Sequence, residues 1–269
     1  MGALLAQLAS ALGDVAANTE RAVAALAAHP EVDIAVFPEL FLCGYDLTLL
    51  EQSARLPDCP ELRRIADAAA AASTAVVVGF AERIGESEVA NSVACIDRDG
   101  SLAAVYRKTQ LFGAEQHVFQ PGEELRIVRL AGVEVGPLIC FDIEFPEPAR
   151  QLAAAGAKLL VTASANMEPF VTDHEIATRA RALENRLPHL YANAVGAAGG
   201  LRLVGHSRSV DAAGTVLAEA ASDEEALLVT PIGTAGAGDE RVDYLRHLPQ
   251  DLIVAGARAG SFATRTPKR

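Results

Sequence analysis

The stretch Gly136-Pro-Leu-Ile-Cys-Phe-Asp-Ile-Glu-Phe-Pro-Glu-Pro-Ala-Arg150 sets one cysteine, Cys140, between two predicted elements. The apolar run 133–139 predicts a strand. Pro146 and Glu147 are typical of a first helical turn, where proline loses no hydrogen bond and glutamate complements the positive helix end. Such a strand-to-helix turn is where proteins hold an exposed nucleophile near amides that favour a thiolate. Because free cysteine is usually buried packing, this segment alone favours a structural role.

Strand-like and helix-like segments alternate on both sides of this stretch. We expect helices at 16–28, 61–72, 146–155 and 174–185, and strands at 1–9, 33–37, 75–81, 133–140, 158–162 and 189–195. Residues 89–106 predict a hairpin whose turn is Asp97-Arg98-Asp99-Gly100. A meander of strands is expected at 205–211, 215–219 and 226–230, followed by a short helix at 239–245 and a basic, mobile tail at 260–269.

This pattern predicts one α/β domain spanning residues 1–269. It contains more strands than a plain doubly wound fold needs, and two sheets between helices accommodate them. No repeat or long linker divides the chain.

Composition excludes several classes of function. The net charge of −12 argues against a nucleic-acid or anionic-membrane surface, since either needs a basic stripe. No window has the run of about 18 apolar residues that a spanning helix requires. The apolar start lacks the basic flank of a secretory signal, so we expect a cytoplasmic protein.

The sequence predicts neither a metal nor a cofactor. Its four cysteines, Cys43, Cys59, Cys95 and Cys140, form no Cys-x-x-Cys pair and have no neighbouring histidine cluster, which argues against zinc and against a disulfide framework. No GxGxxG or phosphate-loop motif supports a nucleotide cofactor.

Two further polar residues follow predicted core strands. Glu39 comes directly after the strand 33–37, among Phe37, Leu40 and Phe41. There a poorly solvated carboxylate would have a raised pKa suited to a general base. Lys108 closes a second strand, 101–106, in the text Tyr106-Arg-Lys-Thr. Each residue alone is typical of a solvated loop, but strand ends can bring both to one crevice with Cys140.

This trio resembles the Glu-Lys-Cys constellation of the nitrilase superfamily of carbon–nitrogen hydrolases, and the likeness covers nearly the whole chain. The matching text, in order, is Ala6-Gln7-Leu8 with Gly13-Asp14 and Asn18, Phe37-Pro-Glu-Leu-Phe-Leu-Cys-Gly-Tyr45, Tyr106-Arg-Lys-Thr-Gln-Leu-Phe-Gly113, Glu115 with Phe119, Pro121 and Gly122, Ile139-Cys-Phe-Asp-Ile-Glu-Phe-Pro-Glu147, Arg179-Ala-Arg-Ala-Leu-Glu-Asn185 and Tyr191-Ala-Asn193.

The resemblance implies an αββα sandwich of two mixed sheets flanked by helices, usually assembled as a homodimer. It also implies Cys140 as nucleophile and Glu39 as its base. Lys108 would stabilise the oxyanion, helped by the backbone N–H of Phe141, and Glu115 would position substrate or water. These roles agree with elementary chemistry, because a thiol needs a base and an oxyanion needs a fixed positive donor.

Two positions depart from the family pattern. Gln110 lies where many members have histidine, and Cys43 lies where threonine is common. Either can alter specificity, although packing is the simpler role for Cys43. Asn166 and Met167, after the strand 158–162, are expected to rim the substrate pocket.

Glu144 and the Phe-Pro-Glu after it resemble the amidase-like members, which predicts hydrolysis of a small amide through a cysteine thioester. The alternatives are a nitrilase or N-carbamoyl amidohydrolase with the same residues, and a catalytically idle binding protein of the same fold. A Cys-His hydrolase using His117, His174, His189 or His206 is a minor alternative.

Overall fold

The computed structural model describes residues 1–233 and Tyr244. The helix expected at 239–245 (apart from Tyr244) and the tail expected at 260–269 lie outside the described residues. The strands are β1 Gly2–Gln7, β2 Ile34–Val36, β3 Ala75–Arg83, β4 Val89–Ile96, β5 Leu102–Arg107, β6 Val128–Leu130, β7 Val133–Ile139, β8 Leu159–Ser164, β9 His189–Asn193, β10 Val195–Ala198, β11 Leu201–Val204, β12 Arg208–Val210, β13 Val216–Glu219 and β14 Ala226–Pro231. The α-helices are α1 Val15–Ala28, α2 Leu50–Ser53, α3 Pro60–Ala72, α4 Pro146–Ala154 and α5 Val171–Asn185, and two 3-10 helices are η1 Gly113–His117 and η2 Cys140–Glu144.

Two six-stranded mixed sheets form the centre of the molecule. One has the order β14-β1-β2-β3-β4-β5 and the other β13-β12-β9-β8-β7-β6. In each sheet three neighbouring strands are parallel, β1-β2-β3 and β7-β8-β9, and the strands outside them pair antiparallel. A separate antiparallel pair, β10-β11, lies in the chain between β9 and β12 of the second sheet.

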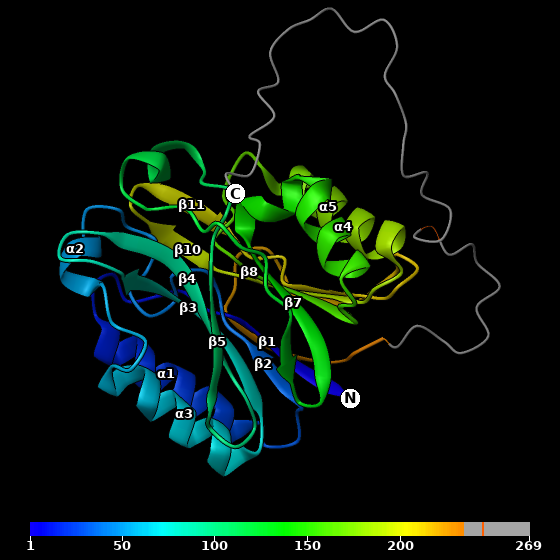
Figure 1. Ribbon diagram of the computed structural model, residues 1–269, viewed down its shortest axis with the longest axis horizontal. Coiled ribbons are helices and arrows are strands. Elements are labelled where there is room, and N and C mark those ends of the chain that lie inside the picture. The colour runs from blue at the N-terminus through cyan, green and yellow to red at the C-terminus, as the bar shows by residue number, and fades with distance from the viewer. Residues whose placement is uncertain (234–243, 245–269) are drawn as a thin grey trace, which may run out of the picture.

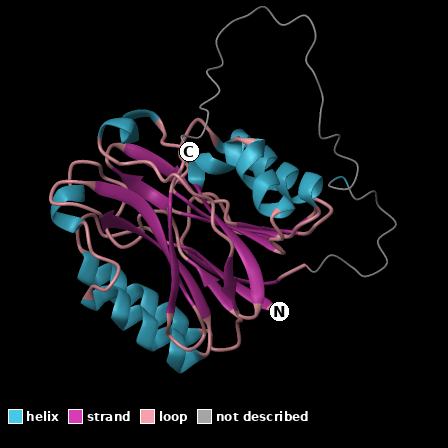
Figure 2. Ribbon diagram, viewed as in Figure 1, coloured by secondary structure: helices cyan, strands magenta, loops and turns pink. Residues whose placement is uncertain are grey.

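Helices cover the outer face of each sheet (Figures 1 and 2). The helices α1 and α3 pack on the first sheet, and α4 and α5 on the second, which gives four layers. Alternate strand residues from both sheets meet in a common interior that includes Leu5, Val36, Val135 and Val161. The αββα sandwich expected from the sequence is confirmed.

Local sequence explains where the main helices begin. The Asp14 side chain accepts a hydrogen bond from the Ala17 amide at 2.9 Å and caps α1. Both α3 and α4 begin with proline, at Pro60 and Pro146, where no backbone donor is lost. The hairpin of β4 and β5 has the predicted bounds to within one residue.

The last described strands depart from the expected meander. The strands β12 and β13 pair with each other, but β14 crosses to the first sheet and pairs antiparallel with β1. The segment expected as one strand at 189–195 also divides into β9 and β10. Local patterns do not encode these long-range pairings.

None of the helices within the described residues has the length and apolar character that a membrane-spanning helix needs.

Candidate active site

Glu39 lies just beyond the carboxyl end of β2, in a loop that passes very close to β3. A Cβ on Gly79 of β3 would lie 2.2 Å from the Pro38 carbonyl oxygen, so only glycine fits there. Leu40 has a φ of 50°, which turns the chain sharply after the glutamate. This tight loop leaves the Glu39 side chain fully buried and fixes its direction.

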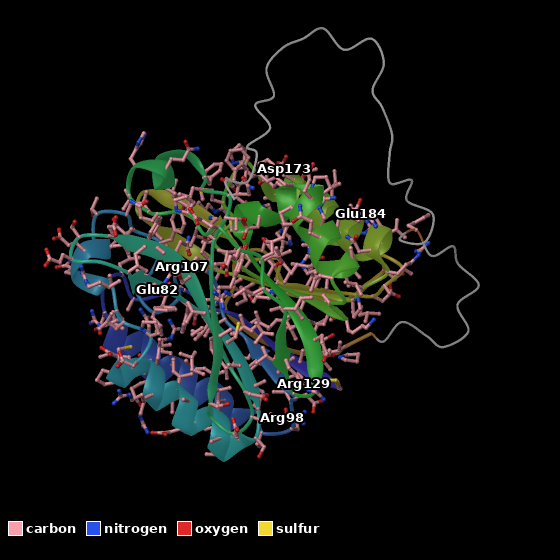
Figure 3. The ribbon with its side chains drawn as sticks, viewed as in Figure 1. Glu82, Arg98, Arg107, Arg129, Asp173 and Glu184 are labelled. Carbon is pink, nitrogen blue, oxygen red and sulfur yellow. The ribbon has the colours of Figure 1, made fainter. Side chains whose placement is uncertain are left out.

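Lys108 follows β5, which runs parallel to β2 because β4 reverses direction between β3 and β5. The carboxyl ends of β2 and β5 therefore lie at the same edge of the sheet. The preceding residue, Arg107, makes two hydrogen bonds, of 2.7 and 2.8 Å, to the Glu82 carboxylate on β3 (both labelled in Figure 3). This pair holds the strand end from which Lys108 projects into the interior.

Cys140 is the first residue of η2, at the carboxyl end of β7 in the second sheet. Its φ of 43° lies in the left-handed region that non-glycine residues avoid. Such strained positions persist only where surrounding contacts hold them, and they are common at reactive residues. Only 6% of the residue is exposed, so the cysteine is buried, as free cysteines usually are, although it lies at a strand-to-helix turn.

The four predicted catalytic residues converge in one buried cluster. Nζ of Lys108 lies 2.6 Å from Oε1 of Glu39 and 2.9 Å from Oε2 of Glu115. Glu115 arrives on η1, where it also accepts hydrogen bonds from the Tyr45 hydroxyl at 2.7 Å and the Phe112 amide at 2.8 Å. The Cys140 thiol is also buried, close enough for the charges of Glu39 and Lys108 to act on its pKa.

Sequence reasoning missed Asn91 of β4 in this cluster. Its Nδ2 donates to Oε1 of Glu39 at 2.7 Å, and the Ala165 backbone amide donates to Oε2 of the same carboxylate at 2.9 Å. The detectable signal was a polar pair, Asn91-Ser92, inside an otherwise apolar strand. Tyr45, which was quoted only as motif text, also belongs to the cluster.

Asp142 is a second residue without a predicted role, and it connects the two sheets at the site. Its Oδ2 accepts from the Tyr106 hydroxyl at 2.8 Å and the Ile139 amide at 2.9 Å. Its Oδ1 accepts from the Gln110 amide at 2.9 Å and from both the amide and the hydroxyl of Thr109. One carboxylate thus holds the residue before the cysteine against the turn after the lysine.

Burial dominates the electrostatics of the cluster. It raises the pKa of Glu39, an effect that Glu115 reinforces and Lys108 opposes. Burial by itself lowers the pKa of Lys108, but the carboxylates of Glu39 and Glu115 more than offset this, and the lysine remains charged.

Burial, followed by the charge of Glu39, raises the pKa of the Cys140 thiol well above its usual range. Lys108 and hydrogen bonds from the Ser164 hydroxyl and the Ala165 amide act in the opposite direction but do not overcome it. A raised pKa favours the neutral thiol over the thiolate that nearby backbone amides would favour. Attack by this sulfur requires a base that removes its proton as the bond forms.

Phenylalanine side chains surround Phe141, the residue after the cysteine. Its ring contacts Phe112 and Phe145 edge-on, with centroids 5.2 and 5.0 Å apart, and Phe112 contacts Phe170 in the same way at 5.5 Å. The four rings come from segments on both sides of the cysteine and are all half-buried.

The remaining predicted pocket residues are held in place by local contacts. Asn166 is buried, and its Nδ2 donates to the Phe170 carbonyl at 3.0 Å. Met167 is buried in the core beside β11. The Cys43 thiol, also buried, donates to the Leu40 carbonyl at 3.5 Å, and burial raises its pKa to about 12. Gln110 lines a surface cavity of about 840 Å³ that extends to α4.

None of the four candidate histidines hydrogen-bonds to the cysteine in the part of the chain that the structure describes. His117 is exposed on η1 and His206 pairs with Glu219. His189 is buried between Thr162 and the Thr178 carbonyl. His174 is buried, and its Nδ1 lies 2.8 Å from the Tyr191 hydroxyl.

The family model of the carbon-nitrogen hydrolases matches residues 4–239. The chain belongs to the carbon-nitrogen hydrolase family. Its relatives include the (R)-stereoselective amidase of a Pseudomonas species, 40% identical over 223 residues that cover 82% of this chain and 81% of the relative. The Hydrolase in pqqF 5'region of Pseudomonas protegens is also 40% identical, over 221 residues covering 81% of this chain and 78% of that one.

Among solved structures, this carbon-nitrogen hydrolase is similar to an amidase from Nesterenkonia sp. AN1, with a TM-score of 0.83 and 30% identity over 92% of this chain and 93% of that one. One structure of that amidase shows covalent addition of the acetamide moiety of fluoroacetamide at the active site cysteine. Another holds butyramide. The expected membership of the nitrilase superfamily, on its amidase-like side, is confirmed.

Proposed function

We propose that this enzyme hydrolyses a small-molecule amide to the carboxylic acid and ammonia through a thioester at Cys140. The observation that carries the proposal is the Lys108 ammonium, buried between the carboxylates of Glu39 and Glu115 beside a neutral buried thiol. Such a cluster supplies a nucleophile, a base and a fixed positive charge, which acyl transfer requires.

In the first half-reaction Glu39 accepts the thiol proton as Sγ of Cys140 attacks the carbonyl carbon. The developing oxyanion accepts hydrogen bonds from Lys108 and from the Phe141 backbone N–H. Glu39 returns the proton to the nitrogen, the C–N bond breaks, and ammonia leaves a thioester. A raised pKa suits Glu39 to both steps, since a proton must be accepted and then released.

In the second half-reaction Glu39 takes a proton from water, which attacks the thioester carbon. The tetrahedral intermediate collapses, the C–S bond breaks, and the sulfur recovers the proton as the acid leaves. Glu115, held by Tyr45 and the Phe112 amide, keeps Lys108 in place and positions the substrate or the water.

The names of the relatives support an amide as the substrate. The curated relative and the solved neighbour described above are both called amidases, and the neighbour's structures contain amides or their adducts at a cysteine. The half-buried rings around Phe141 favour an acyl group with an apolar part over a strongly polar one.

The test is ammonia release from a panel of amides, nitriles and N-carbamoyl compounds, with wild type and Cys140→Ala compared. We expect turnover of amides that Cys140→Ala abolishes. Turnover of nitriles or N-carbamoyl compounds in place of amides would assign another reaction to the same residues. Wild-type ammonia release by Cys140→Ala would remove the cysteine from the mechanism.

A further inference from the structure

Asn91 contacts three of the four residues of the catalytic cluster. Its Nδ2 lies 2.7 Å from Oε1 of Glu39 and 3.5 Å from Oε1 of Glu115. Its backbone carbonyl accepts a hydrogen bond from the Lys108 amide at 2.8 Å, which continues the ladder between β4 and β5 by one residue. Only 1% of the residue is exposed. The asparagine is therefore a fixed part of the cluster.

Strand direction explains how Asn91 reaches the site. Because β4 runs antiparallel to β3 and β5, it begins at the edge of the sheet where β5 ends. Asn91 is the third residue of β4 and lies beside Lys108 at that edge. The next residue, Ser92, points to the opposite face, where its hydroxyl donates to Glu82 at 2.8 Å. A shift of one position along the strand would turn the asparagine away from Glu39.

The hydrogen bonds to Glu39 distinguish its two carboxylate oxygens. Oε1 accepts from Nδ2 of Asn91 and, at 2.6 Å, from Nζ of Lys108. Since a carboxylate oxygen has two lone pairs, these two donors occupy Oε1. Among the described residues, Oε2 accepts only from the Ala165 amide, at 2.9 Å, and keeps one lone pair. Oε2 is therefore the oxygen that can take a proton without losing a hydrogen bond.

The oxygen with the open lone pair is held toward the second sheet. Both donors to Oε1 lie in or just after strands of the first sheet, whereas Ala165 directly follows β8 of the second. β7 and β8 pair in parallel and place Ile139 beside Ala163. Cys140 and Ala165 therefore leave neighbouring strand ends. Oε2 is bound to the sheet that carries the nucleophile.

Oδ1 of Asn91 indicates that this residue does not serve stability alone. Within the part of the chain that the structure describes, this buried oxygen has no hydrogen-bond partner. A buried acceptor without a partner destabilises a fold, and a leucine of similar size would avoid that loss. The reverse orientation of the amide would set Oδ1 against the Glu39 carboxylate, so the NH2 group must face the base. What the asparagine supplies is this donor.

We propose that Asn91 is a positioning residue for the base: with Lys108 it occupies Oε1 of Glu39, so that Oε2 takes the proton of the Cys140 thiol. The proton moves from Sγ to Oε2 as the S–C bond forms, and from Oε2 to the nitrogen as the C–N bond breaks. Without Asn91, Oε1 has an open lone pair on the side away from the second sheet, and a proton bound there neutralises the carboxylate without serving the reaction. This inference rests on Glu39 and Cys140 as base and nucleophile of the proposed function.

The test compares wild type with Asn91→Leu in two pH profiles, ammonia release from butyramide and alkylation of Cys140 by iodoacetamide. Burial raises the pKa of Glu39 and the hydrogen bond from Asn91 opposes this, so loss of the donor moves the acid limb of both profiles upward. We expect a rise of about one pH unit, the effect of one hydrogen bond to a charged group. Above the limb, kcat should fall about tenfold, because one donor fewer holds the base. Alkylation is followed by intact mass, needs no turnover and has Cys140→Ala as its background.

The matched control is Asn185→Leu. Asn185, at the end of α5, is also buried, donates through Nδ2 to the Arg181 carbonyl at 2.9 Å, and has an Oδ1 without a partner among the described residues. The same substitution there should leave both limbs and kcat unchanged. The charged or titratable groups that interact with Glu39 remain in every Asn91 variant, namely Lys108 after β5, Glu115 in η1, Cys140 in η2, Tyr45 after β2 and Tyr191 in β9.

Acid limbs that stay at the wild-type pH in Asn91→Leu would overturn the proposal, because a merely structural role lowers the folded fraction without moving them. A kcat at or above wild type would overturn it as well, since removal of Asn91 would then have opened the oxygen that accepts the proton. Asn91→Val, which is smaller and suits a strand, carries the same test if the leucine variant does not fold. The proposed function fails separately, if Glu39→Gln or Cys140→Ala releases ammonia at the wild-type rate.

Discussion

Asp142 offers a sharp test of how the site is held together. The substitution Asp142→Asn keeps the shape of the side chain but replaces one acceptor oxygen with an NH2 donor. Five hydrogen bonds reach this carboxylate, three from backbone amides and two from hydroxyls. The hydroxyls of Tyr106 and Thr109 can reverse their direction, whereas the amides cannot.

The least damaging orientation turns the new NH2 toward Tyr106 and Ile139. Tyr106 then becomes the acceptor, and the buried Ile139 amide loses its partner, at a cost of about 1–3 kcal/mol. Loss of the charge weakens the remaining hydrogen bonds by about 1 kcal/mol in total. Part of this loss is offset because the neutral asparagine avoids the cost of burying an anion, the same cost that raises the pKa of Asp142. We expect the free energy of unfolding to fall by about 2–3 kcal/mol.

Activity should fall by more than stability alone explains, because Ile139 directly precedes the strained cysteine. Looser placement of the nucleophile predicts a loss of about 10- to 100-fold in kcat/KM under conditions where the variant is fully folded. Denaturant unfolding and amide turnover measure the two effects, with the exposed Asp223→Asn as the matched control. An Asp142→Asn enzyme within 0.5 kcal/mol and twofold of wild type, on the order of a neutral surface change, would refute this reasoning.

Three further predictions concern charged groups. Lys108→Ala should lower kcat by about 10²–10³-fold through loss of one oxyanion donor, and lower the free energy of unfolding by about 3–5 kcal/mol because two carboxylates stay buried without their cation; a near-neutral kcat would remove the lysine from that role. Because burial raises the pKa of Glu39 above 4.5, the acid limb of kcat/KM should lie above pH 4.5, with activity rising as the carboxylate forms, and a limb at or below 4.5 contradicts its part as base. Burial lowers the pKa of His189 from 6.5 to about 4, so the unfolded chain binds more protons between these values, and the free energy of unfolding decreases as the pH is lowered through this range. Between pH 7 and pH 5 wild type should lose about 2 kcal/mol more than His189→Gln in urea unfolding, and equal losses would show that this histidine does not titrate on unfolding.

Much of the fold was predictable because its elements have strong local patterns. The hairpin of β4 and β5 and the helices α1, α3 and α4 lie within one or two residues of their expected bounds. The pairing of β14 with β1 was not predictable from the sequence, since it joins two segments more than 200 residues apart and the strand pattern of β14 fits either sheet.

The residues of the candidate site also include some that the sequence predicted and some that it did not. Glu39, Lys108 and Cys140 were predicted because each follows a strand in a recognisable motif, and the structure brings them together. The depth of the thiol beside these groups could not be derived from its own segment, because it depends on β8 and α5, which contact η2 from other parts of the chain. Asn91 and Asp142 were missed because a single polar residue in an apolar run gives no sign of what it will contact.

The most direct test of the account is intact-mass analysis of enzyme quenched during turnover of a small amide. The account predicts an added mass equal to the acyl group, mapped by peptide analysis to Cys140 and absent from Cys140→Ala. Turnover without any acyl adduct at Cys140, or an adduct that persists in Cys140→Ala, would contradict the thioester mechanism.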